Sequence, residues 1–397
     1  MNNTENRQDA RVLAWRKRFG VQTSTNENGG HFELESADGA AEAPEERIRC
    51  AREEMKRIVM ERFGGDAALL AAVQDIVLTS QDAVKVLQDG QREPAVQEYS
   101  SLEAIVAFDG TRPSFLVREG KIDLESSFST SQWKTALSPR LLQLEAFAAC
   151  VGRVEIGQAG IGTAFLVAPT LAITNRHVAQ AIAQFGPEGI DIHPNVFLDF
   201  GREHQGRESY DRRVITGVAF AGTRVVEPPI EHTKLDLALL RVEPSSCSDV
   251  SARLRKLELH LNLVEIEPSW TVAAVGYPGD WRRYVPPALR TQHEEVITRL
   301  LDGDSGCKRI APGLSSGMLP GVGSTATHDA TTINGNSGSP LAILSGAAPL
   351  RAAGLHYGGQ WQGERANWAH LLSACGGMPV TGGLDLRSAL AQQEVVL

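Results

Sequence analysis

The chain has 397 residues, of which 42% are hydrophobic and 22% charged, and its formal net charge is −9 at pH 7. This composition excludes a wholly disordered chain, because apolar side chains are numerous enough to offset the entropy lost on folding. The acidic balance argues against a nucleic-acid partner, since such partners normally require a basic surface.

A membrane protein is not expected, since no run approaches the roughly 18 consecutive apolar residues of a spanning helix. Residues 1–17 are polar and charged where a signal peptide has an apolar core, so we expect a cytoplasmic protein. The five cysteines are widely spaced, odd in number and without a CxxC pair. They predict reduced structural thiols rather than a disulfide framework or a zinc site, and we expect no metal and no cofactor.

Glycine and proline divide the chain into two parts. Residues 1–138 hold 9 of the 38 glycines and 3 of the 19 prolines. Short strands joined by turns need both residue types, whereas helices avoid them. The first part is therefore predicted to be largely helical and the second largely β.

The first part begins with a polar segment, residues 1–44, that is expected to be weakly ordered. Behind Pro44, which suits the first turn of a helix, apolar residues recur at helical spacing until Gly64. Two further helices are predicted, one after Asp66 and one over residues 80–88.

These helices define residues 45–98 as a helical module for regulation or docking. The connecting segment, residues 99–138, contains apolar runs at 104–108 and 114–117 that read as strands. It is expected to pack on the domain that follows, which comprises residues 139–397.

The second part is expected to open with a helix over residues 139–149 and to continue as a series of short strands. The pattern favours an antiparallel sandwich or barrel over a doubly wound sheet, because the strands do not alternate with long helices. Strands are predicted over residues 152–156, 163–167, 171–174, 196–200, 214–219, 237–242, 271–276, 341–344 and 352–357.

A serine between glycines, in the segment Asn334-Gly-Asn-Ser337-Gly-Ser-Pro340, is the first candidate for chemistry. Such a turn exposes the hydroxyl and lets backbone N–H groups converge on one point as an oxyanion hole. GxSxG also describes the nucleophile elbow of α/β-hydrolases. That reading is disfavoured, because only 60 residues follow Ser337 and Pro340 opens a strand rather than a helix.

Two other residues complete the constellation. An apolar hairpin ends in Thr174-Asn-Arg-His177, and Asp236 stands at the start of an apolar strand. Either residue alone would more often be a packing histidine or a surface aspartate. An acid that enters a buried strand needs a partner, however. The chain order His177, Asp236, Ser337 favours a common role.

Together these motifs resemble the trypsin/chymotrypsin-like serine peptidases over about residues 145–390. The resemblance implies an all-β fold of two six-stranded antiparallel barrels, here preceded by a small, mostly α-helical domain. It also implies that Ser337 is the nucleophile, His177 the general base and Asp236 its orienting acid. The N–H groups of Gly335 and Ser337 would form the oxyanion hole.

The residue before the nucleophile is Asn336, where trypsin has an aspartate. In this position the chain is similar to bacterial glutamyl endopeptidases and to the high-temperature-requirement proteases. The segment Gly354-Leu-His-Tyr-Gly-Gly also resembles the specificity pocket of the glutamyl endopeptidases. The resemblance implies substrate binding by Thr332, His356, Tyr357 and Gly358, with cleavage after Glu and, second, after Asp. A pocket tuned to an apolar side chain is the alternative.

The sequence thus predicts an intracellular serine endopeptidase that acts on protein or peptide substrates through an acyl-enzyme intermediate. We expect regulation by a protein partner through residues 1–138. The rival is a peptidase-like binding or scaffold protein that no longer cuts, which the complete triad disfavours. Two further segments, Arg112-Pro113 to Trp133 and His328-Asp329, are similar to segments of bacterial relatives but receive no catalytic role.

Overall fold

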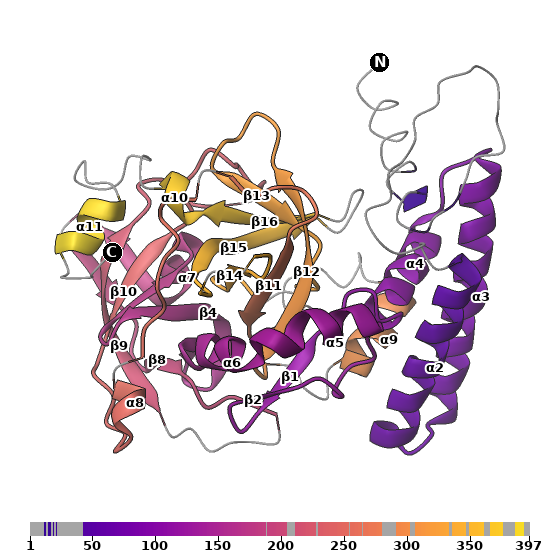
Figure 1. Ribbon diagram of the computed structural model, residues 1–397, viewed down its shortest axis with the longest axis horizontal. Coiled ribbons are helices and arrows are strands. Elements are labelled where there is room, and N and C mark those ends of the chain that lie inside the picture. Colours follow the sequence, from indigo (N-terminus) through magenta and orange to yellow (C-terminus); the bar gives the residue numbers. More distant parts are fainter. Residues whose placement is uncertain are drawn as a thin grey trace.

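A helical bundle lies beside two β-barrels in the computed structural model (Figure 1). The structure describes residues 12, 15, 16, 19, 21 and 43–392, apart from residues 188, 205–210, 228, 254, 264, 280–290, 302–305, 333–335, 347–348, 361–365 and 376–385.

Three helices of the N-terminal region form most of the bundle, namely α2 (Pro44–Phe63), α3 (Ala67–Asp89) and α4 (Val96–Phe108). Pro44 lies in the first turn of α2, and Gly64 ends the helix in the left-handed conformation. The Asp66 carboxylate caps α3 by accepting hydrogen bonds from two backbone N–H groups. The first predicted helix is therefore confirmed, together with the signals that bound it.

Two predictions for this region are wrong. The helices expected after Asp66 and over 80–88 are one continuous helix, because the apolar positions keep helical spacing through Ser80 with no breaking residue. The strand expected over 104–108 is the last part of α4. Its apolar run is buried inside the bundle, and such a run does not by itself distinguish a strand from a buried helix.

The fourth helix of the bundle comes from the second barrel. Helix α9 (Gln292–Leu301) lies between two barrel strands in the sequence, yet it packs among α2, α3 and α4 (Figure 1). Its Val296 and Leu300 join the buried cluster of the bundle. Polar contacts add to the apolar ones, since Thr291 Oγ1 lies 2.8 Å from Ser100 Oγ. Of the segment predicted to be weakly ordered, the described Trp15 and Phe19 are buried in the same cluster, and most of the rest lies outside the described residues.

Among the described helices, α3 is long and apolar enough to cross a membrane by length and mean hydropathy. Within the bundle its apolar side packs against α2 and α4, and Asp75, Asp82 and Lys85 lie on its exposed side.

A short connecting region joins the bundle to the barrels. It comprises β1 (Phe115–Arg118), β2 (Lys121–Asp123), α5 (Ser131–Leu137), a 3-10 turn (Ser138–Arg140) and α6 (Leu141–Ala149). The predicted strand over 114–117 and the helix over 139–149 are confirmed within two residues. Strand β1 pairs with a strand of the second barrel, with Phe115 opposite Ile310.

The two predicted six-stranded antiparallel barrels are confirmed. The first closes in the order β10-β5-β4-β3-β8-β9, and the second in the order β11-β14-β15-β16-β13-β12, where pairing of β11 with β12 completes the ring. The strands of the first barrel are β3 (Val151–Ile156), β4 (Ala159–Ala168), β5 (Leu171–Thr174), β8 (Val196–Asp199), β9 (Arg212–Ala221) and β10 (Ala238–Val242). Those of the second are β11 (Thr271–Gly276), β12 (Arg309–Met318), β13 (Thr325–His328), β14 (Pro340–Ile343), β15 (Ala352–Gln360) and β16 (Ala366–Leu371).

All nine predicted strands of this part are present, and five further strands are not predicted. The additional ones are β6 (Ala183–Gly186), β7 (Gly189–Ile192), β12, β13 and β16. Short helices complete the domain, namely α7 (Arg176–Ile182), α8 (Val250–Arg253), α10 (Leu372–Cys375) and α11 (Leu386–Gln392).

Burial on both faces explains why barrel strands read as continuous apolar runs. On β4, Ala164 and Leu166 belong to the cluster inside the first barrel, whereas Phe165 and Val167 belong to a cluster that includes residues of both barrels. Since side chains alternate along a strand, both faces of β4 need apolar residues.

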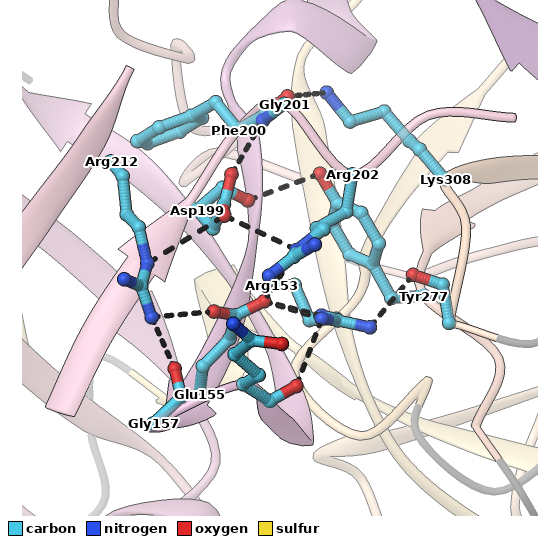
Figure 2. A network of polar contacts seen from close by, with 12 residues as sticks. Arg153, Glu155, Gly157, Asp199, Phe200, Gly201, Arg202, Arg212, Tyr277 and Lys308 are labelled. Carbon is cyan, nitrogen blue, oxygen red and sulfur yellow. Dashed lines mark hydrogen bonds and ion pairs between the residues drawn. The ribbon is translucent and has the colours of Figure 1, made fainter. Parts of the chain in front are cut away.

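A buried carboxylate, Glu155 on β3, organises a network of charges on the first barrel (Figure 2). It accepts hydrogen bonds from Arg153, Arg202 and Arg212 at 2.8–3.0 Å. Asp199, also fully buried, lies 3.3 Å from Arg202. The arginines share the two buried carboxylates, which offsets part of the cost of removing these carboxylates from water.

The same network holds both ends of the insertion that carries α9. At its start, Tyr277 Oη donates to the carbonyl of Val151 at 3.2 Å. At its end, Arg153 Nη1 donates to the carbonyl of Gly306 at 3.1 Å. Lys308 Nζ donates to the carbonyl of Phe200 at 3.1 Å (Figure 2). The base of the insertion is thus fixed to the first barrel while its helix lies in the bundle.

Candidate active site

His177 and Asp236 are joined by a pair of hydrogen bonds at the edge of the first barrel. His177 lies in the first turn of α7, and Asp236 lies two residues before the start of β10. His177 Nδ1 lies 2.6 Å from Asp236 Oδ2, and the backbone N–H of His177 donates to Asp236 Oδ1 at 2.9 Å. Asn175, the residue immediately before α7, donates from Nδ2 to the carbonyl of Asp236 at 2.9 Å. Both carboxylate oxygens are therefore committed to His177.

The electrostatics of this pair keep Asp236 ionised. Its side chain is buried, which alone would raise the pKa, but the charge of His177 and its two hydrogen bonds hold the pKa of Asp236 below its ordinary value. An ionised Asp236 fixes the ring proton of His177 on Nδ1. The other nitrogen, Nε2, is then an acceptor that can take a proton.

A second histidine lies behind Asp236. His370 on β16 accepts a hydrogen bond at Nε2 from the backbone N–H of Asp236 at 3.0 Å. Burial lowers the pKa of His370 to about 4, so the ring is neutral at pH 7 and able to accept. The Tyr357 ring stacks on it at 4.2 Å between centroids, and Tyr357 Oη lies 2.7 Å from His232 Nδ1.

Ser337 lies in a tight loop between the two barrels. Its carbonyl accepts a hydrogen bond from Thr163 N on β4 at 2.8 Å, and Gly338 N donates to the carbonyl of His356 on β15 at 2.9 Å. Gly338 has φ +90, and a Cβ there would lie 1.9 Å from the carbonyl oxygen of Thr163. The loop is thus tied to both barrels, with the Ser337 side chain partly exposed. The predicted oxyanion-hole residue Gly335 lies outside the described residues.

The predicted pocket residues Thr332 and His356 are both buried, and each carries a polar atom without a hydrogen-bond partner among the described residues. These atoms are Thr332 Oγ1 and His356 Nδ1. His328, on β13, packs edge-on against His356 with ring centroids 5.5 Å apart, and neither of its ring nitrogens has a described partner. Buried polar groups without a partner are uncommon in folded proteins, so each calls for an explanation such as a bound water or a functional role.

Burial is the first cause of the unusual pKa values in this group. It holds the pKa of His356 well below its ordinary value, and the neighbouring His328 and His177 lower it further. Burial also lowers the pKa of His328 to about 4, which Asp329 partly opposes. Both rings are therefore neutral at pH 7.

The remaining predicted pocket residues lie beside this group. The side chain of Tyr357 is buried and bonded to His232, so any contact of this residue with a substrate falls to its backbone. A Cβ on Gly358 would lie 3.0 Å from Ile230, a half-exposed residue of the loop before Asp236. In the described part of the chain, no group of three or more His, Cys, Asp or Glu side chains is placed to hold a metal ion.

The buried His328 should make stability depend on pH. In the unfolded chain a histidine has a pKa near 6.5, whereas that of the folded His328 is about 4. Below pH 6.5 the unfolded state therefore binds a proton that the folded state does not, and stability is lost as the pH falls. We expect a loss of about 2 kcal/mol from this residue between pH 7.5 and 5, measurable by urea unfolding.

The His328→Leu variant should lose this part of the pH dependence. The exposed His193→Leu provides the matched control for removal of a histidine. Equal pH slopes in the two variants would contradict the argument.

The family model that matches this chain agrees with the architecture. Residues 162–347 match the family model of the trypsin-like peptidase domain. A probable serine protease of Lysobacter enzymogenes is 26% identical over 325 residues, which cover 73% of this chain and 77% of that protein. Among solved structures, neuropsin, a serine protease expressed in the limbic system of mouse brain, matches at 14% identity with a TM-score of 0.38 and covers 58% of this chain and 92% of its own. Residues 162–347 thus form a trypsin-like peptidase domain, and the chain is a serine endopeptidase.

Proposed function

We propose that His177, Asp236 and Ser337 are the catalytic triad of this endopeptidase and that it cleaves proteins after Glu. The observation that carries the proposal is the 2.6 Å contact between His177 Nδ1 and Asp236 Oδ2, together with a Ser337 loop that is tied to both barrels. The five cysteines are free, which is typical of a reducing compartment, so we place the enzyme in the cytoplasm.

The chemistry follows from these groups. Ser337 Oγ attacks the carbonyl carbon of the peptide bond while His177 Nε2 takes its proton, because a neutral serine is a weak nucleophile at pH 7. The ionised Asp236 stabilises the imidazolium that forms. His177 then protonates the leaving amine, and an acyl-enzyme remains on Ser337. Water attacks this ester by the same route in reverse and releases the acid product.

Backbone N–H groups of Gly335 and Ser337 would bind the oxyanion of each tetrahedral intermediate. Each such donor contributes about 2.7–4 kcal/mol of transition-state stabilisation.

Labelling with a fluorophosphonate tests the triad. This reagent forms a covalent bond with an activated serine, so the full-length wild type should be labelled and Ser337→Ala should not. A folded wild type that resists labelling at pH 7–8 would contradict the proposal and favour a peptidase-like binding protein.

The specificity for Glu is supported by the orphaned polar atoms of the pocket. A carboxylate can accept hydrogen bonds from Thr332 Oγ1 and from an N–H of His356, whereas an apolar side chain would leave both atoms unpaired at a cost of about 1–3 kcal/mol each. His328, packed edge-on against His356, has two further buried ring nitrogens without a described partner. A pocket of this kind favours Glu or Asp over Phe.

Hydrolysis of peptides that differ only in the residue before the cleaved bond tests this assignment. We expect Glu to be preferred, then Asp, and we expect His356→Leu to lower kcat/KM for the Glu peptide about 100-fold, as loss of a hydrogen bond to a charged group implies. His193→Leu is the matched surface control. A wild-type preference for Arg or Phe would contradict the acidic specificity while leaving the triad intact.

We further propose that a protein partner regulates the enzyme through the N-terminal helices. The support for this proposal is their double connection to the peptidase domain, through α9 and through the connecting segment after α4.

A further inference from the structure

Two sequence features without a catalytic role meet in the structure. Arg112 Nη2 donates a hydrogen bond to Asp329 Oδ2, across 217 residues of sequence. Thr331 Oγ1 donates to the carbonyl of Arg112 at 2.7 Å. Arg112 therefore holds the segment after β13 with its side chain and with its main chain.

The other carboxylate oxygen of Asp329 is also used. Oδ1 accepts a hydrogen bond from the backbone N–H of Leu314 on β12 at 2.7 Å. Asp329 thus joins Arg112 to the second barrel, and both side chains of the ion pair are largely buried, with 17% and 23% of their surface exposed. An ion pair shielded to this degree is worth more than one in open water, because the surroundings screen it less.

On its other side, Arg112 belongs to the N-terminal region. Trp133 Nε1 donates to the carbonyl of Thr111 at 2.9 Å, and the Trp133 ring lies 5.7 Å from the Arg112 guanidinium. Thr111 N donates to Asp109 Oδ1 at 2.9 Å, and Asp109 Oδ2 accepts from Arg47 Nε of α2 at 2.8 Å. Asp109 is fully buried, so this chain of bonds is rooted inside the helical bundle.

We propose that Arg112 is a positioning residue for the specificity pocket. Through Arg112, the helical bundle fixes the position of residues 329–332, which form the pocket wall. Thr332, whose orphaned hydroxyl faces no described partner, directly follows Thr331. The inference rests on the proposed function, because it needs Thr332 to contact the substrate. A displaced wall changes how the substrate side chain is held, whereas the His177–Asp236 pair lies on the other barrel and keeps its geometry.

The test uses the full-length chain with Arg112→Met, Arg112→Lys and Thr331→Val. Methionine keeps the aliphatic bulk but loses the charge, lysine keeps the charge, and valine removes the Thr331 hydroxyl at nearly constant volume. The matched control is Lys134→Met, whose ion pair with Glu125 stays within the connecting segment. Two readouts are compared, namely kcat/KM for a Glu peptide and the labelling rate with a small fluorophosphonate that places no side chain in the pocket.

We expect Arg112→Met to lower kcat/KM about 10–100-fold, mainly through KM, since a small misplacement of a binding group is costly. Labelling should change less than about threefold. Arg112→Lys should recover part of the loss, Thr331→Val should resemble Arg112→Met, and Lys134→Met should behave as the wild type.

A purely structural role predicts a different outcome. Arg112→Met would then lower the melting temperature while kcat/KM, measured well below that temperature, stays unchanged, and this result would overturn the inference. A fall in labelling equal to the fall in kcat/KM would overturn it too. If the wild type itself is neither labelled nor active, the proposed function fails, and the inference fails with it. This result differs from the two above, because those concern Arg112→Met in an enzyme whose wild type is active.

Discussion

Ser337→Ala is expected to lower kcat by about a million-fold, because the triad acts as a unit and alanine offers no nucleophile. Binding should be preserved, since the loop is held by backbone bonds from Ser337 and Gly338 that the substitution keeps. The measurement is kcat with a Glu peptide, together with a binding assay for an uncleaved peptide. The variant should therefore bind substrate and not turn it over.

Ser339→Ala is the control for this experiment. Ser339 lies two residues further along the same loop and is fully buried, and its side chain makes a long 3.4 Å hydrogen bond to Asn336 Oδ1. Its loss should cost about 1 kcal/mol of stability and leave the enzyme active. If Ser339→Ala were inactive and Ser337→Ala active, the nucleophile would be assigned to the wrong serine.

Asp236→Asn is expected to lower kcat about ten-thousand-fold with little change in fold. An asparagine amide is nearly the same size, but it can turn its N–H towards His177 Nδ1. The ring proton then moves to Nε2, and His177 can no longer take a proton from Ser337. The charge that stabilises the imidazolium is lost as well.

The exposed Asp191→Asn provides the matched control, since it removes a surface carboxylate from β7, in the two-stranded sheet that follows α7. Urea unfolding of both variants separates loss of catalysis from loss of fold. A reduction in kcat of less than tenfold in Asp236→Asn would show that another group orients His177.

Strands with apolar runs were accessible from the sequence, whereas three strands of the second barrel were not. Strand β12 contains Pro312, Gly313 and Gly317, which are typical of turns. Its conformation depends on partners on both sides, β11 and β13. Gly313 is required by packing, because a Cβ there would lie 2.4 Å from the backbone nitrogen of Ala330. Local propensity cannot report a strand that is stabilised mainly by its neighbours.

In the helical region, an apolar run predicted to be a strand is a helix. The apolar run that ends α4 has the β-branched and aromatic residues of a strand, yet the bundle buries it as a helix. The start of α4 is fixed by the Glu98 carboxylate, which accepts a hydrogen bond from Ala95 N at 2.7 Å. Tertiary packing decides the conformation of such a run, and the sequence alone leaves it open.

Some residues of the candidate site could be predicted from local motifs, and others could not. His177, Asp236 and Ser337 stand in short motifs, so each could be recognised locally and weighed by chain order. His370 contacts Asp236 across 134 residues and lies on β16, a strand that was not predicted. His328 lies at the end of β13, also not predicted. Neither the contact of His370 with Asp236 nor the packing of His328 on His356 has a local signature in the sequence, because both arise only when the second barrel closes.

Helix α9 belongs to an insertion in the second barrel, yet it completes the hydrophobic core of the N-terminal helices. Val296 and Leu300 are buried only because the N-terminal helices cover them, and those helices complete their core only with α9. A gene that lost the extension but kept the insertion would expose these side chains to water, and one that lost the insertion would open the bundle. The extension and the insertion should therefore be inherited as one unit, present together or absent together in each relative. A fragment cut at the apparent boundary near residue 139 would separate two pieces that share a single core.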